Sequence, residues 1–155
     1  MYQAFTKTLL ALSTAALFST TALAQKPAAT AGYTVSVFAV GNEKYTAPDS
    51  IALANGHIFI GYGGPGLPDG SDGKSSYILE YTKTGTEVHA YAVLGHNDGL
   101  KLNPYDGKLY ALQNEDANPN LVIIDPVTKA QTGPIKFAAL PDHGGGYDEI
   151  GRAHV

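Results

Sequence analysis

The chain contains no cysteine and no tryptophan, and its 155 residues include one methionine. Without cysteine no disulfide can stabilise the fold, so stability must come from a packed core or from bound ions. Basic residues are also scarce, with 10 lysine plus arginine against 14 aspartate plus glutamate, and they form no run. Because binding to a phosphate backbone needs clustered cations, nucleic acid is not an expected partner.

Helical periodicity is also absent after the first 24 residues. What is present are 18 glycines, 9 prolines and 10 tyrosines, a composition typical of many turns and many strands. Asn55–Gly56 is a strong two-residue hairpin signal between two apolar runs. We therefore predict an all-β fold with strands in the short runs rich in β-branched and aromatic residues: 33–38, 50–54, 57–62, 77–81, 87–93, 100–102, 108–112, 121–124 and 135–138.

The first 24 residues have the pattern of a secretory signal peptide. Lys7 precedes a short apolar stretch, and small residues end it at Ala22 and Ala24. Serines and threonines interrupt the stretch, which falls short of the ~20 apolar residues that a bilayer span needs. We expect cleavage after Ala24, a periplasmic or extracellular protein with no membrane span after cleavage, and a flexible leader over residues 25–32.

The series of strands repeats along the chain. Four segments recur in the same order: Asp49–Leu53 as Asp98–Leu102 (offset 49), Ile58–Phe59 as Leu109–Tyr110 (offset 51), Tyr77–Tyr81 as Leu121–Asp125 (offset 44) and His96 as His143 (offset 47). Four short strands in a unit of roughly 40–50 residues are typical of β-propeller blades. The alternative is a β-sandwich whose self-similarity is accidental.

Residues 33–148 are therefore predicted to form two propeller blades and the start of a third at Gly146–Asp148. Such blades bury their faces only against neighbouring blades, so two cannot close a ring. The last residues, Ile150–Val155, share neither pattern nor composition with the repeat, and one back-translation of them matches a common sequencing adapter. We expect residues 149–155 to be a non-native read-through tail that ends an incomplete propeller.

Two segments resemble the repeat of a known group of propellers. Pro48–Ile60 and His96–Ala111 are similar to the blade pattern of six-bladed propellers, which include gluconolactonase-like and luciferin-regenerating-type proteins and NHL-type repeats. The resemblance covers about Pro48 to Asp148 and implies a six-bladed fold. The Glu-Gly-Pro opening of the lactonases is absent from this chain.

The resemblance also implies where a site would lie. In that group the residue that opens each innermost strand lies at the mouth of the central channel, and lactonase members hold a divalent cation there. The matching positions here are Asp49, Asp98 and Asp148, an oxygen set suited to Ca²⁺. His96, Asn97 and His143 are the candidate ligand-binding residues beside them. The aspartates could instead cap loops, and the histidines could contact the neighbouring blade.

Two loops of matching position could shape that mouth or remain mobile surface loops: residues 61–76 and 113–120. The chain has no phosphate loop, no nucleophile elbow and no His-Glu-x-x-His motif. The expected function is a lactonase-like, metal-assisted hydrolase or a binder of a small molecule or glycan at the channel mouth. The alternative is a non-enzymatic propeller that binds protein or polysaccharide through its top loops.

Overall fold

The computed structural model describes residues 27–137, and within that range the fold is all-β, as predicted. Its eight strands are β1 (Pro48–Ala54), β2 (His57–Tyr62), β3 (Ser75–Tyr81), β4 (Glu87–Leu94), β5 (Asn97–Leu102), β6 (Leu109–Gln113), β7 (Asn120–Ile124) and β8 (Gln131–Lys136). No helix long and apolar enough to cross a membrane occurs among these described residues. The predicted signal peptide and the predicted read-through tail lie outside the described range.

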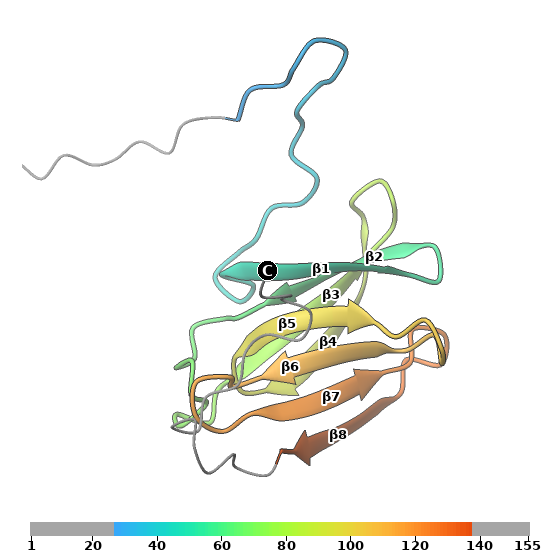
Figure 1. The fold of residues 1–155 in the computed structure, drawn as a ribbon. Coiled ribbons are helices and arrows are strands. Elements are labelled where there is room, and N and C mark those ends of the chain that lie inside the picture. Colours follow the sequence, from blue (N-terminus) through green and yellow to red (C-terminus); the bar gives the residue numbers. More distant parts are fainter. Residues whose placement is uncertain (1–26, 138–155) are drawn as a thin grey trace, which may run out of the picture. The chain divides into compact units, whose positions relative to one another are not determined.

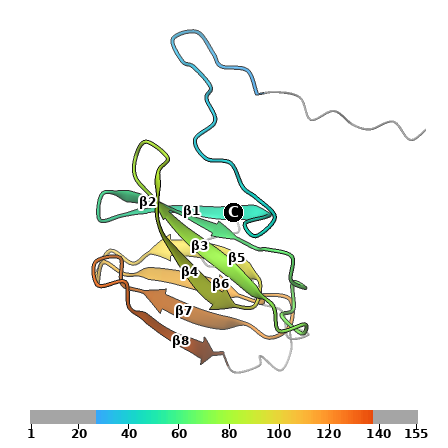
Figure 2. The ribbon, with the colours of Figure 1, turned by 180° about the vertical axis from the view of Figure 1, so that it is seen from behind.

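The strands form two antiparallel meanders of four strands each. The first sheet has the order β1-β2-β3-β4 and the second β5-β6-β7-β8 (Figures 1 and 2). At the β1–β2 turn Asn55 and Gly56 both have positive φ, 47° and 77°, as the predicted hairpin requires. Residues 27–36 form a separate unit without strands. The strand expected over 33–38 is not formed, because these residues make no ladder with another strand.

The two sheets share an irregularity at the start of their first strands. Pro48 pairs with Tyr62 and Ser50 with Gly61, which leaves Asp49 as an extra residue in a β-bulge. In the second sheet Asn97 pairs with Gln113 and Gly99 with Leu112, which leaves Asp98 as the extra residue. In these pairings Asp49 matches Asp98 at an offset of 49, and Tyr62 matches Gln113 at an offset of 51.

The offset predicted for the third strands is wrong by one residue. Tyr62 pairs with Tyr77 and Gln113 pairs with Asn120, so Tyr77 corresponds to Asn120, an offset of 43 rather than 44. Because side chains alternate across a strand, a shift by one moves every residue to the other face. The apolar runs Ile78–Leu79 and Leu121–Ile124 do not alternate with polar residues, so the sequence does not determine the register in which these strands pair.

The main core lies between the two sheets. It contains side chains from one face of each: Ala52, Ala54, Phe59, Ile78, Tyr91 and Val93 from the first, and Leu100, Leu109, Ala111, Val122 and Ile124 from the second. The sheets approach most closely where β1 and β2 lie against β5 (Figure 1). Aromatic rings add to this core, with Phe59 and Tyr91 6.3 Å apart between centroids.

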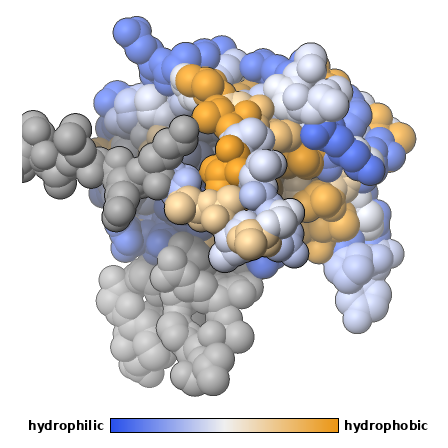
Figure 3. Space-filling view, turned by 90° about the horizontal axis from the view of Figure 1, so that it is seen from above, coloured by the Kyte–Doolittle hydropathy of each residue, from blue (hydrophilic) through white to orange (hydrophobic). Residues whose placement is uncertain are grey.

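Corresponding strands of the two sheets bury different faces in the interface between the sheets. Leu100 faces the first sheet and is 2% exposed, whereas its equivalent in β1, Ile51, points away from the second sheet and is 62% exposed. Leu53 beside it is also exposed, and apolar side chains reach the surface in the space-filling view (Figure 3).

Residues 38–45 cover part of the other face of the first sheet. Tyr45 contacts the rings of Tyr62 and Tyr77, and Phe38 meets Tyr81 edge-on at 5.7 Å. Tyr62, Leu79 and Tyr81 form a second, smaller buried cluster there. The cover lies over β2 and β3 and leaves the apolar positions of β1 exposed.

Candidate functional site

The structure brings two of the three predicted metal ligands together. Asp49 and Asp98 occupy the matching bulges of β1 and β5, and these strands begin side by side, since Ser50 Oγ donates to Asn97 Oδ1 at 3.4 Å. The two carboxylates are near enough that the charge of Asp49 raises the pKa of Asp98. The third predicted ligand, Asp148, and the predicted ligand-binding residue His143 lie outside the described residues.

Asp98 is the most perturbed carboxylate of this site. Its side chain is buried, and Oδ2 accepts a hydrogen bond from the Glu115 N–H at 3.0 Å. Burial raises the pKa of Asp98 to about 6; the Glu115 N–H and His96 oppose the shift, while Asp49 and Asp116 add to it. Perturbed carboxylates of this kind are typical of functional sites, because folding alone gains nothing from them.

His96 lies beside Asp98, with its Nε2 3.5 Å from Asp98 Oδ1. The ring packs flat against the chain at Gly63, where a Cβ would approach its Cε1 and Nε2 to 2.6 Å. Its main chain is fixed by Asn114, whose Oδ1 accepts from the His96 N–H at 2.8 Å and whose own N–H donates to the His96 carbonyl at 2.9 Å. Nδ1 is buried and has no hydrogen-bond partner.

Asn97 has a different task from its neighbours. It is fully buried, and its Nδ2 donates to the carbonyls of Gly99 and Leu112 at 3.3 and 3.2 Å. A Cβ at Gly61 would lie 2.0 Å from its Oδ1, so the amide fills the space left by that glycine. These contacts hold the bulge of β5 in shape and favour a structural role over direct ligand binding.

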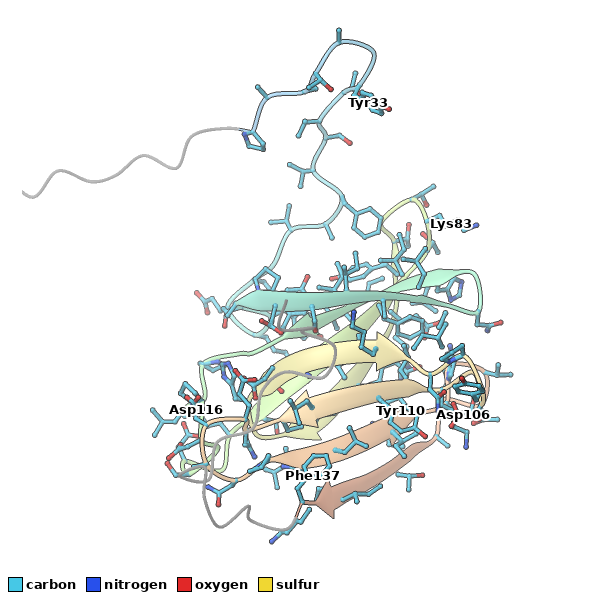
Figure 4. All side chains as sticks on the ribbon, in the orientation of Figure 1. Tyr33, Lys83, Asp106, Tyr110, Asp116 and Phe137 are labelled. Carbon is cyan, nitrogen blue, oxygen red and sulfur yellow. The ribbon has the colours of Figure 1, made fainter. Side chains whose placement is uncertain are left out.

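The loops at this end of the sheets meet, and they contribute a residue that the sequence did not single out. Asn118 Nδ2 donates to the Asp69 carbonyl at 3.0 Å, which joins the β2–β3 loop to the β6–β7 loop. Asp116 of the second loop lies at the end of the sheet where β5 begins (Figure 4) and raises the pKa of Asp98. The sequence indicated that this loop could face the mouth, but nothing distinguished Asp116 from its polar neighbours.

The side chains at this site carry donor atoms that divalent cations bind, but they make an incomplete ligand set. Asp49 and Asp98 supply carboxylates, and His96 supplies a ring nitrogen. Among residues 27–137 no three histidine or acidic side chains are arranged to hold a metal ion. Burial is the main cause of the raised pKa of Asp98, and a divalent cation would oppose it by favouring the ionised carboxylate.

Asp49 also borders a shallow hollow on the outer side of the first sheet. The hollow measures about 170 Å³ and is lined by Pro48–Ile51 and Ile60.

The chain matches no protein-family model, no curated protein and no solved structure with which it was compared.

Proposed function

We propose that the chain is part of an exported β-propeller, of the six-bladed type, that binds a small ligand where its innermost strands begin. A divalent cation, Ca²⁺ in the first instance, would be held there by Asp49 and Asp98, with Asp148 as the third carboxylate. The observation that carries the proposal is the pair of matching bulges, which place an aspartate from each repeat at the same end of adjacent strands. Hard cations are bound by oxygen ligands that converge from separate strands in this way.

The packing between the sheets supports a propeller over a sandwich. A sandwich buries one face of each sheet and leaves both outer faces polar. Here Ile51 is exposed at a position whose equivalent, Leu100, is buried against the neighbouring sheet. A head-to-tail interface of this kind can be repeated by further sheets, as a closed ring of blades requires. The approach at β1 and β5 is also what inner strands of adjacent blades show.

The chain's own residues would bind and orient the cation and its ligand. The Glu115 N–H fixes Asp98 Oδ2, and Asn97 fixes the bulge that directs the Asp98 carboxylate. When bound, the cation would polarise a lactone or ester carbonyl, or lower the pKa of a water. His96 is the group beside the carboxylates that could accept a proton from such a water. These roles support a lactonase-like hydrolase as the activity to test first.

One observation favours the alternative function. The β2–β3 and β6–β7 loops are joined by the Asn118–Asp69 hydrogen bond at the end of the sheets where the aspartates lie. A surface built from loops of adjacent repeats suits a non-enzymatic propeller that binds protein or polysaccharide through its top loops. The two functions differ in whether the bound molecule is turned over.

The test uses the full-length protein and Ca²⁺ as the probe. Calorimetric titration should give saturable binding that Asp98→Asn abolishes. Asp106→Asn is the matched control, because Asp106 lies at the opposite end of the sheet and is exposed (Figure 4). Lactone and ester turnover in the same variants separates hydrolase from binder. Absence of Ca²⁺ binding in the folded wild type would remove the cation site, and binding without turnover would favour the alternative.

A further inference from the structure

The tip of the β1–β2 hairpin is an asparagine followed directly by a glycine. Asn55 and Gly56 are both exposed, and they join the end of β1 to the start of β2 (Figure 1). Both residues have positive φ, and a Cβ built at Gly56 would meet no atom within 4 Å. The main chain at Gly56 is therefore open to solvent, and no side chain on it shields the peptide bond that precedes it.

The side-chain amide of Asn55 makes no hydrogen bond within the described part of the chain. The remaining described asparagines all use theirs, and none of them is followed by glycine. Each donates or accepts at least one hydrogen bond through its side chain: Asn42, Asn97, Asn103, Asn114, Asn118 and Asn120. Among residues 27–137, Asn55 alone combines an unrestrained amide with a glycine after it.

The corresponding turn of the second sheet, between β5 and β6, restrains the same kind of residue pair. Here Asp106 precedes Gly107. Asp106 Oδ1 accepts from the Lys108 N–H at 3.0 Å, and the Gly107 N–H donates to the Asn103 carbonyl at 2.9 Å. The Gly56 N–H has no such partner among the described residues. The side chain and the nitrogen after it are therefore held in one turn and free in the other.

An unrestrained asparagine side chain can react with the main chain that follows it. The Gly56 nitrogen, after losing its proton to hydroxide, forms a bond to Asn55 Cγ, and the bond from Cγ to Nδ2 breaks with release of ammonia. Water then opens the cyclic imide at either of its two carbonyls. Opening at one carbonyl leaves aspartate, and opening at the other leaves isoaspartate, in which the main chain runs through the former side chain. The reaction consumes one water and needs no other reagent.

The structure of the turn favours this reaction at Asn55. A side chain on the following residue would crowd the attacking nitrogen, and glycine has none. Each hydrogen bond that must break before the attack slows the reaction, by about fivefold for a bond of ordinary strength. Asn55 and Gly56 have no such bond to break. Asparagine is in any case one of the thermolabile residues.

We propose that Asn55 is a site of spontaneous deamidation in the folded protein. Each event adds one negative charge to a chain whose formal net charge is −4. The aspartate form keeps the hairpin, because Asp-Gly also suits a two-residue turn with positive φ. The isoaspartate form adds a main-chain atom at the tip, which disrupts the pairing of Ala54 with His57. Asp49 lies at the other end of β1, so this proposal and the cation site can fail independently.

The experiment is incubation of the full-length protein at mildly alkaline pH, with peptide mapping by mass spectrometry over time. Peptides in which an NH₂ has been replaced by OH identify the asparagines that react. Asn55 should react at least about tenfold faster than any other described asparagine, which a barrier lower by about 1.4 kcal/mol provides. The rate should rise with pH, because the attacking nitrogen must lose its proton.

The matched variant is Asp106→Asn, which puts the same dipeptide into the hydrogen-bonded turn. Its new asparagine should react at least about tenfold more slowly than Asn55, because two hydrogen bonds must break first. In urea, where the fold is lost, the two rates should converge. Asn55→Asp should melt like the wild type, whereas the isoaspartate fraction, separated by ion exchange, should melt at a lower temperature.

Three results would overturn the proposal. The first is an intact Asn55 at a time when other described asparagines have reacted. The second is an equal rate at Asn55 and at the new asparagine of Asp106→Asn in the folded protein, because the turn would then have no influence. The third is a folded-state rate at Asn55 more than about tenfold below the rate in urea, because the hairpin would then protect the residue.

Discussion

The buried ion pair between the two sheets gives the sharpest test of their packing. Glu80 of β3 is fully buried and accepts from Lys129 Nζ, which lies 2.6 Å from both carboxylate oxygens. Tyr91 Oη donates to Glu80 Oε2 at 3.1 Å, and His57 Nδ1 contacts Oε1. Lys129 belongs to the β7–β8 turn, so the ion pair with Glu80 joins the two sheets.

We predict that Lys129→Met destabilises the protein by about 2–3 kcal/mol. Removing one partner of a buried pair costs roughly 3–5 kcal/mol, because the remaining charge stays buried. The Lys129 side chain is 34% exposed, and solvent screening reduces that figure. Methionine preserves the length of the side chain and keeps a non-glycine residue at φ 65°, so the backbone cost is unchanged. The equivalent turn position in the first sheet is Gly85, at φ 84°.

The measurement is chemical denaturation followed by circular dichroism, with Lys83→Met as the control. Lys83 lies in the corresponding β3–β4 turn and is exposed (Figure 4), so its loss should cost less than about 0.5 kcal/mol. The melting temperature of Lys129→Met should fall by roughly 10 °C. Equal effects of the two substitutions would show that the ion pair does not hold the sheets together.

The pH dependence of the same variant provides an independent check. Burial alone would raise the pKa of Glu80, but hydrogen bonds from Lys129, His57 and Tyr91 lower it below its ordinary value of 4.5. Ionised Glu80 therefore adds stability above the unfolded-state pKa, and this contribution is lost as the pH falls through the lower folded-state pKa. The difference between wild type and Lys129→Met should be largest near neutral pH and should shrink below about pH 4.

Three further predictions follow from the same structure. Asp98→Asn should stabilise the cation-free protein by about 1–2 kcal/mol above pH 6, because a raised carboxyl pKa disfavours the ionised folded state. This gain in stability should vanish below about pH 4. Urea denaturation at both pH values measures the difference. Gly61→Ala should cost about 1–3 kcal/mol by the same assay, since its Cβ would clash with Asn97 and Ser50. Ile51→Asp in the full-length protein should cost about 3 kcal/mol or more if another sheet covers β1, and less than about 0.5 kcal/mol in a sandwich.

Much of the fold could be predicted because it depends on local signals. The hairpin at Asn55–Gly56 follows from two residues that tolerate positive φ. The sequence similarity paired Asp49 with Asp98, and both residues lie at a β-bulge in the first strand of their sheet. The strand expected over 33–38 failed because alternation does not supply a pairing partner, and a strand depends on one for its backbone hydrogen bonds.

The contacts between the two sheets could not be predicted from the sequence, for a physical reason. Lys129 and Glu80 are 49 residues apart, and only the packing of the two sheets brings them together. The unpaired Oδ1 of Asn120 is likewise a property of the packed fold, because an asparagine at a strand start ordinarily finds a backbone partner.

The bulge at Asp49 and Asp98 has a consequence for how such a chain can grow by duplication. Each copy of the repeat brings its own strand, its own turn and, at the bulge, its own negative charge. Apolar faces gain from every added copy, while carboxylates gathered at one place repel each other more with each one. A longer array would therefore bury more apolar surface and, at the same time, bind protons or cations more strongly. A chain that lengthened by duplication of this unit would gain, with each new sheet, another carboxylate that needs a counterion.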